Sequence, residues 1–290
     1  MEGRILYPQP FSFSYYDPKN NRLYETKLIF IEKGDHKILI NRHNNLDYIL
    51  DSNSPSNIEY KNLKNQLKAY DEKLKPFQNN DSKNIDTKQN FLQKYIIRQP
   101  NSYVAFWEIV NDFSKFGFTK SYLKSLSLFS QSVKKAFSFI EFKKIIDIEN
   151  STNIGGNFPD VSFNSNDKIV KSDFSNYQVT VIDYWATFCK PCIQDLPKLV
   201  ELYEKYKNKG VNFISVTDEN KIERIELATK ILENNKVGWK NYFDVNKEFP
   251  KKLNASGYPL QILVDRNGKI IARKLGELDQ IESEIKKNLE

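Results

Sequence analysis

The two cysteines of this 290-residue chain stand where an apolar segment gives way to an amphipathic one. The apolar segment VTVIDYW (179–185) has the length and the β-branched residues of a buried strand, and Ile193 to Lys207 repeats its apolar residues at helical spacing. Cys189 and Cys192 lie between the two segments. Any fold that accommodates this pattern must therefore carry a dithiol where a central strand ends and the next helix begins.

Strands and helices alternate through the rest of residues 151–290. After the first strand and helix, the pattern predicts a second strand at VNFISVT (211–217) and a second helix from Ile222 to Asn234. A hairpin then follows, formed by QILVD (261–265) and KIIARKL, and a covering helix begins at Leu278. This order specifies an α/β fold, in which a mixed central sheet carries helices on both faces.

Residues 1–150 are organised differently. Period-two alternation between turns in residues 1–52 predicts a small antiparallel sheet from the segments FSFSYY, YETKLIFIE, KILIN and DYILD. Residues 53–148 then change to helical spacing. We therefore predict two domains, 1–150 and 151–290, and the first is a small β-sheet followed by helices.

Three local patterns refine the helical part of the first domain. Ser56 and Glu59 have the spacing of a capping box, which predicts the start of a helix. The polar stretch Gln78 to Asn90 is typical of a connector. Later apolar faces are rich in aromatic residues and predict a core, not a cofactor site: Phe91 to Ile96, Tyr103 to Phe113, and Val133 with Phe137 and Ile140.

The formal net charge of +7 comes from lysines scattered among asparagines and acids. This pattern is typical of a solvated surface, and no basic stripe alternates with an aromatic platform, so no nucleic-acid partner is expected. No window approaches the ~20 apolar residues of a membrane-spanning helix. The first residues lack the basic and apolar parts of a signal peptide, so either the protein is cytoplasmic or an export signal has been removed.

Both cysteines belong to one C-x-x-C motif, so the pair must be explained by its own chemistry. At a helix N-terminus, unpaired N–H groups and the helix dipole stabilise a thiolate at Cys189, and Lys190 adds a positive charge. Pro191 restrains the first turn, where its missing N–H costs nothing. The predicted chemistry is thiolate exchange: Cys189 attacks a partner disulfide and Cys192 resolves the mixed disulfide, with no cofactor besides the redox-active disulfide.

Other roles for the two cysteines fit less well. Structural zinc needs four ligands, whereas one C-x-x-C motif supplies two. The histidines that could supply the others, His36 and His43, lie in the first domain, so no metal is expected. A peroxidatic cysteine is expected in a Thr-x-x-Cys context, but Thr187 stands two residues before Cys189. An inert pair does not fit the start of a helix.

Two carboxylates are candidates for moving protons. Asp183 falls inside an apolar strand, where an unpaired acid is costly, and a buried acid with a raised pKa suits a proton acceptor for Cys192. Asp195 lies three residues past Cys192 and hence on the same side of the helix. Favourable charge in the first turn is an equally good explanation for Asp195.

A second constellation is Gly257-Tyr258-Pro259, directly before QILVD. Proline cannot donate to a sheet ladder, so at the start of a strand it signals a special turn. A cis peptide bond fits this context, although a trans turn is the default.

The segment VIDYWATFCKPCIQDLP resembles the active-site stretch of TlpA/ResA-like thiol-disulfide oxidoreductases, AhpC/TSA-like members of the thioredoxin superfamily. IGGNFPDVSFNSNDKIVKSDF upstream and SGYPLQILVDRNGKIIA downstream continue the resemblance. It implies a thioredoxin fold with an N-terminal hairpin extension over residues 151–290. It also implies that Pro259 is a cis-proline facing the dithiol, that Asp183 is the buried acid, and that Asp195 stands where this class often has a glutamate near the sulfurs. Pro197 matches the proline that bends the active-site helix.

The resemblance also indicates a substrate groove around the dithiol. Tyr258 is bulkier than the usual residue before the cis-proline, and Leu260 replaces the common threonine after it. These departures concern the choice of partner and leave the chemistry unchanged. The residues expected to line the groove are Trp185, Phe188, Lys190, Pro191, Tyr258, Pro259 and Leu260.

The first domain is similar to the N-terminal domain that precedes TlpA-like domains in exported proteins of Bacteroidetes-type bacteria. FIEKGDHKI, SNSPSN and RQPNSYVAFW carry this similarity. It implies a periplasmic protein, anchored as a lipoprotein by a signal absent from the chain, with protein thiol or disulfide clients and an upstream electron donor.

Three functions follow as hypotheses. The first is an exported thiol–disulfide reductase. The second is a disulfide oxidase or isomerase that dimerises through its N-terminal domain, and the third is a non-catalytic module that binds clients. The direction of electron flow depends on the relative stability of the dithiol and disulfide forms, which residue types alone do not determine.

Overall fold

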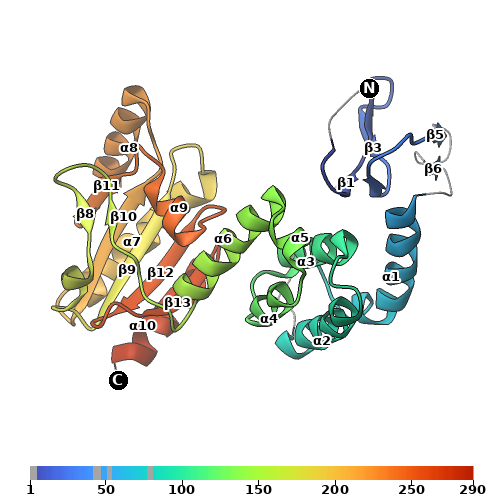
Figure 1. Ribbon diagram of the computed structural model, residues 1–290. Coiled ribbons are helices and arrows are strands. Elements are labelled where there is room, and N and C mark those ends of the chain that lie inside the picture. The colour runs from blue at the N-terminus through green and yellow to red at the C-terminus, as the bar shows by residue number, and fades with distance from the viewer. Residues whose placement is uncertain (1–4, 42–46, 51–53, 77–80, 290) are drawn as a thin grey trace. The chain divides into compact units, whose positions relative to one another are not determined.

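The computed structural model describes residues 5–41, 47–50, 54–76 and 81–289 (Figure 1). The chain forms two compact units, Met1–Ile146 and Asp147–Glu290. The boundary between them falls within one helix, α6 (Phe137–Thr152).

The strands of the first unit form antiparallel pairs. β1 pairs with β4, β2 with β3, and β5 with β6. Among the described residues, the predicted single sheet over residues 1–52 is thus replaced by three two-stranded ladders, because strands of three or four residues are separated by turns. The strands are β1 (Gln9–Phe11), β2 (Ser14–Asp17), β3 (Arg22–Glu25), β4 (Ile29–Ile31), β5 (Ile38–Asn41) and β6 (Asp47–Leu50).

Helices follow the strands, as predicted for residues 53–148. Their apolar faces surround Phe106, whose ring lies 5.3 to 6.2 Å from those of four other aromatic residues. The helices are α1 (Pro55–Asp71), α2 (Ser82–Arg98), α3 (Tyr103–Phe116), α4 (Ser121–Ser127), α5 (Gln131–Lys134) and α6.

The predicted capping box at Ser56 and Glu59 is wrong. α1 begins at Pro55, whose fixed φ suits a first helical position, and Ser54 is its N-cap residue without a side-chain cap bond. Glu59 instead accepts hydrogen bonds from Tyr95 and Ser102 of neighbouring segments. Tertiary partners therefore outweigh the local pattern here.

Two further predictions in this unit need correction. The polar stretch Gln78 to Asn90 is helical from Ser82 onward, where Asp81 caps α2 by accepting the Lys83 N–H at 2.9 Å. The predicted apolar face after Val133 is also displaced: Phe137 and Ile140 are 71% and 43% exposed. The side chains of α6 that enter the core are instead Phe139, Phe142 and Ile146.

One charged residue in the polar first half of α2, Lys88, is buried and paired inside the unit. Lys88 is 1% exposed, and its Nζ contacts carboxylate oxygens of Asp71 at 2.6 Å, Glu108 at 2.9 Å and Asp112 at 2.5 Å. Burial alone lowers the pKa of Lys88, but Asp112 and Glu108 outweigh it and raise the pKa overall. The lysine thus stays charged and balances buried carboxylates.

Lys88→Met is expected to destabilise the protein by about 3–5 kcal/mol, because it leaves buried carboxylates without their cation. Chemical denaturation of the full chain measures this loss. Lys144→Met is the matched control, since Lys144 and its partner Glu141 are 63% and 44% exposed and such pairs contribute little. Equal stability of the two variants would contradict the structural role of Lys88.

The second unit contains the predicted mixed sheet. Its five strands run in the order β11-β10-β9-β12-β13, with β9, β10 and β11 parallel and β12 and β13 antiparallel to their neighbours. Its elements are β7 (Val161–Ser162), β8 (Lys168–Ile169), β9 (Val179–Trp185), α7 (Lys190–Tyr206), β10 (Val211–Thr217), α8 (Ile222–Asn234), β11 (Lys240–Phe243), α9 (Glu248–Leu253), β12 (Leu260–Asp265), β13 (Ile270–Leu275) and α10 (Ile281–Leu289).

Side chains of the central strand β9 enter two cores in alternation. Val179 and Val181 pack with residues of α7 and α10, whereas Ile182 and Tyr184 pack on the opposite face with residues of α9 and β7. All seven residues of β9 are buried for this reason. The small hairpin β7–β8 precedes the sheet, so the unit has the thioredoxin fold with its N-terminal hairpin, as predicted.

Candidate active site

The two cysteines lie at the N-terminus of α7. Cys189 is the N-cap residue, and its sulfur accepts the Cys192 N–H at 3.2 Å. α7 begins at Lys190, three residues earlier than predicted, because Cys189 caps it and Pro191 suits its first turn. A disulfide joins the cysteines, so the structure represents the oxidised form. Cys189 is 8% exposed and Cys192 2%, so Cys189 is the more accessible residue of the pair.

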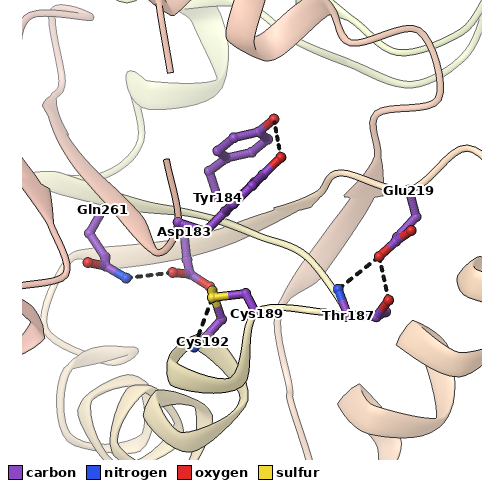
Figure 2. Close-up of a disulfide and its surroundings, with 8 residues drawn as sticks. Asp183, Tyr184, Thr187, Cys189, Cys192, Glu219 and Gln261 are labelled. Atoms are coloured by element: carbon purple, nitrogen blue, oxygen red, sulfur yellow. Dashed lines mark hydrogen bonds between the residues drawn. A yellow bond between two sulfur atoms is a disulfide. The ribbon is translucent and has the colours of Figure 1, made fainter. Parts of the chain in front are cut away.

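Asp183 lies on the face of β9 that packs against α7, because side chains alternate along a strand and Val181 has that orientation. It is 4% exposed and accepts a hydrogen bond from Gln261 Nε2 at 2.8 Å. Gln261 stands directly opposite in the β12–β9 ladder. Figure 2 shows the Asp183 side chain pointing toward the disulfide.

Burial raises the pKa of Asp183 to about 7, although the Gln261 hydrogen bond acts in the opposite direction. The nearby carboxylate of Asp195 raises it further. A carboxyl group with a pKa near neutrality can take up and release a proton at physiological pH. The site therefore contains a buried group suited to exchanging a proton with a thiol.

Asp195 is half-buried on α7, and burial raises its pKa, although Lys198 opposes this effect. Because it contributes to the pKa of Asp183, the two carboxylates interact across the space between α7 and β9. Asp195 therefore adds negative potential near the sulfurs.

Of the predicted groove residues, Tyr258 packs against the cluster that contains Cys189 and Cys192. The Tyr258–Pro259 peptide bond is cis and directly precedes β12. The half-buried Tyr258 ring lies 5.5 Å from the Phe188 ring, perpendicular to it, and Phe188 is 64% exposed. Lys190 and Pro191 are also exposed at the start of α7.

Trp185 and Leu260 do not line the groove as predicted, because both side chains are in the core, at 0% and 3% exposure. Trp185, the last residue of β9, packs beside the cysteines and Ala228 of α8. Leu260 packs on the opposite face of the sheet.

The sequence did not reveal two acids that join this site. Asp218 accepts the hydroxyl groups of Tyr184 and Tyr258. Glu219 accepts the N–H and hydroxyl of Thr187, as Figure 2 shows. The sequence feature that could have identified these two acids is their position directly after the strand VNFISVT, since the carboxyl ends of parallel strands meet at one edge of a sheet.

Three carboxylates of the first unit come within 4.8 Å of one another: those of Asp71, Glu108 and Asp112. The Lys88 ammonium group contacts all three and takes the place that a cation would need. Of the histidines weighed for zinc, His36 contacts the Glu32 carbonyl through Nε2 at 2.7 Å, and His43 lies outside the described residues.

A disulfide at the start of the helix after a central strand, on a thioredoxin-type sheet, defines a thiol–disulfide oxidoreductase of the thioredoxin superfamily. The Redoxin family profile matches residues 153–289. The chain is 32% identical over 123 residues to thiol-disulfide oxidoreductase ResA of Bacillus thuringiensis subsp. konkukian, a match that covers 41% of this chain and 68% of the relative. The chain therefore belongs to the TlpA/ResA-like thiol-disulfide oxidoreductases.

Other similarities cover the same unit. Sporulation thiol-disulfide oxidoreductase A of Bacillus subtilis is 23% identical over 35% of this chain and 61% of its own length. A solution structure of a thiol:disulfide interchange protein from Bacteroides sp. is 25% identical, covers 46% of this chain and 90% of its own, and has a TM-score of 0.38. Among the described residues, no helix has the length and apolar character needed to cross a bilayer.

Proposed function

We propose that this protein reduces disulfides of client proteins outside the cytoplasm by dithiol exchange through Cys189 and Cys192. The observation that carries the proposal is the Cys189–Cys192 disulfide at the N-terminus of α7, on the side of β9 where Asp183 is buried. The other supports are the resemblance of the second unit to ResA and that of the first to domains of exported proteins.

The reaction begins with the dithiol form. The Cys189 thiolate, stabilised by the α7 N-terminus, attacks a client disulfide, forms a mixed disulfide and releases one client thiolate, which takes up a proton. Cys192 then gives its proton to the Asp183 carboxylate, attacks the Cys189 sulfur and releases the second client sulfur as a thiolate, which takes up a proton as Asp183 gives up its own. The client gains two electrons and two protons, and the protein is left with the Cys189–Cys192 disulfide. An upstream dithiol donor restores the starting form by the reverse exchange.

The charges near the sulfurs favour the reductive direction. The Asp183 side chain points toward the disulfide and Asp195 stands three residues after Cys192 on α7, and these carboxylates disfavour the thiolate that the reduced form carries. This effect destabilises the reduced form relative to the disulfide, so the dithiol tends to pass its electrons on.

The reduction potential tests this direction. We expect a value nearer that of thioredoxin, about −270 mV, than that of the oxidant DsbA, about −120 mV. Equilibration of the full chain with glutathione or dithiothreitol redox buffers measures it. A value near that of DsbA would favour the alternative of a disulfide oxidase or isomerase, and failure to reduce insulin with dithiothreitol as electron source would favour a client-binding module.

The proposal places the activity in the periplasm, with attachment through a lipid anchor, and the alternative location is the cytoplasm. Fractionation of the native cells followed by detection of the protein tests this part separately. Recovery in the soluble cytoplasmic fraction alone would contradict an exported reductase.

A further inference from the structure

Two consecutive buried acids follow β10, the strand beside the dithiol strand. In the parallel β10–β9 ladder Thr217 lies opposite Trp185, and the Asp218 N–H donates to the Trp185 carbonyl at 2.8 Å. Asp218 and Glu219 are 3% and 7% exposed. Because a buried carboxylate is costly unless it accepts hydrogen bonds, the partners of these acids show what each one holds in place.

Asp218 holds the segment that precedes the cis-proline. Its Oδ2 accepts the Tyr184 hydroxyl at 2.8 Å and the Tyr258 hydroxyl, and Lys247 binds its Oδ1. Burial and the hydrogen bond to Asp218 raise the pKa of Tyr258 to about 12, so the hydroxyl remains a donor at neutral pH. The position of the Tyr258 ring, directly before Pro259, therefore depends on Asp218.

Glu219 holds the loop on the other side of the site. Its Oε1 accepts the Thr187 N–H at 2.8 Å and also the Thr187 hydroxyl (Figure 2). Thr187 directly precedes Phe188 and lies two residues before Cys189. The position of the exposed Phe188 ring therefore depends on Glu219.

The rings of Phe188 and Tyr258 meet edge to face beside Cys189, with centroids 5.5 Å apart. We propose that Asp218 and Glu219 are positioning residues, which set the spacing of these rings and thereby select the client segment that reaches Cys189. Two aromatic rings form an apolar contact, so the preferred client has an apolar side chain beside its reacting cysteine. This inference rests on the proposed disulfide reductase function.

The test compares three disulfide substrates with the full chain. Two are cystine peptides that differ only in carrying Leu or Ser beside the reacting cysteine, and the third is bis(2-hydroxyethyl) disulfide, which has no side chains. The Tyr258→Phe variant removes one hydroxyl group and keeps the ring, and Glu219→Ala removes the acceptor for Thr187. Tyr206→Phe is the matched control, because its hydroxyl also bonds a carboxylate, that of Glu282 at 2.9 Å, on α10.

We expect the wild type to prefer the Leu peptide, and Tyr258→Phe and Glu219→Ala to raise KM for that peptide about tenfold, with a much smaller effect on kcat. Glu219→Gln keeps an oxygen acceptor and is expected to restore KM. Tyr206→Phe is expected to match the wild type. The inference is overturned by equal KM changes for all three substrates, or by no change in Tyr258→Phe. A wild type that reduces none of the three would instead refute the proposed function.

Discussion

Cys192→Ser is expected to accumulate a mixed disulfide between Cys189 and its client. The attack by Cys189 still proceeds, but no second thiolate is present to release the client. Insulin turnover is expected to fall at least about a thousandfold, because the two cysteines act as one unit. Non-reducing electrophoresis and mass spectrometry of the adduct, which dithiothreitol dissolves, measure the result.

Cys189→Ser is the matched variant for this experiment. It keeps Cys192, which is 2% exposed, and is expected to show neither turnover nor adduct because the buried sulfur does not reach a client. Adducts formed through Cys192 in this variant would reverse the assigned roles. The absence of any adduct in Cys192→Ser, in the native compartment, would contradict the exchange mechanism.

Asp183→Asn is expected to make the protein more stable and less active. The carboxyl group of the unfolded chain titrates near its ordinary pKa of 3.8, and burial raises the pKa in the folded state to about 7. Between these pH values the folded state binds more protons than the unfolded state, so the wild type loses stability as the pH rises. Above pH 7 the wild type carries the full free-energy cost of burying a charged carboxylate. Asparagine removes this cost, which adds about 2–4 kcal/mol to the free energy of unfolding.

The same substitution removes the proposed proton acceptor for Cys192. The release of the client from the mixed disulfide is expected to slow about a hundredfold at pH 7. Stopped-flow measurement of the rate at which the Cys189–Cys192 disulfide forms reports the slower release. Denaturation at pH 8 and pH 4 reports the change in stability. Asp195→Asn is the control for charge alone, since Asp195 is half-buried and a smaller change is expected. Equal stability of Asp183→Asn and wild type at pH 8 would show that the carboxyl group carries no buried charge.

Local patterns correctly predicted that the dithiol lies between the end of β9 and the start of α7. A strand of buried residues, two cysteines and an amphipathic helix are contiguous in the chain, so their geometry follows from backbone periodicity and from the preferences of a helix start. Asp183 could be found because an acid among Val181, Ile182 and Tyr184 departs from the pattern of its own strand.

Residues that act through distant partners were not predictable in this way. The hydrogen bonds of Gln261 to Asp183, of Tyr258 to Asp218 and of Thr187 to Glu219 join residues 78, 40 and 32 positions apart. The removal of the Trp185 and Leu260 side chains from the groove was also not predictable, because the elements that cover them come from other parts of the chain.

The sequence by itself determined the redox pair, the α/β order of residues 151–290 and the class of chemistry, because each rests on neighbouring residues. Tertiary structure alone decided that Lys88, in the polar first half of α2, is buried, since its burial needs carboxylates from α1 and α3. It also decided which side chains border Cys189. Sheet pairing and packing bring those side chains together, and these depend on contacts between segments that are far apart in the chain.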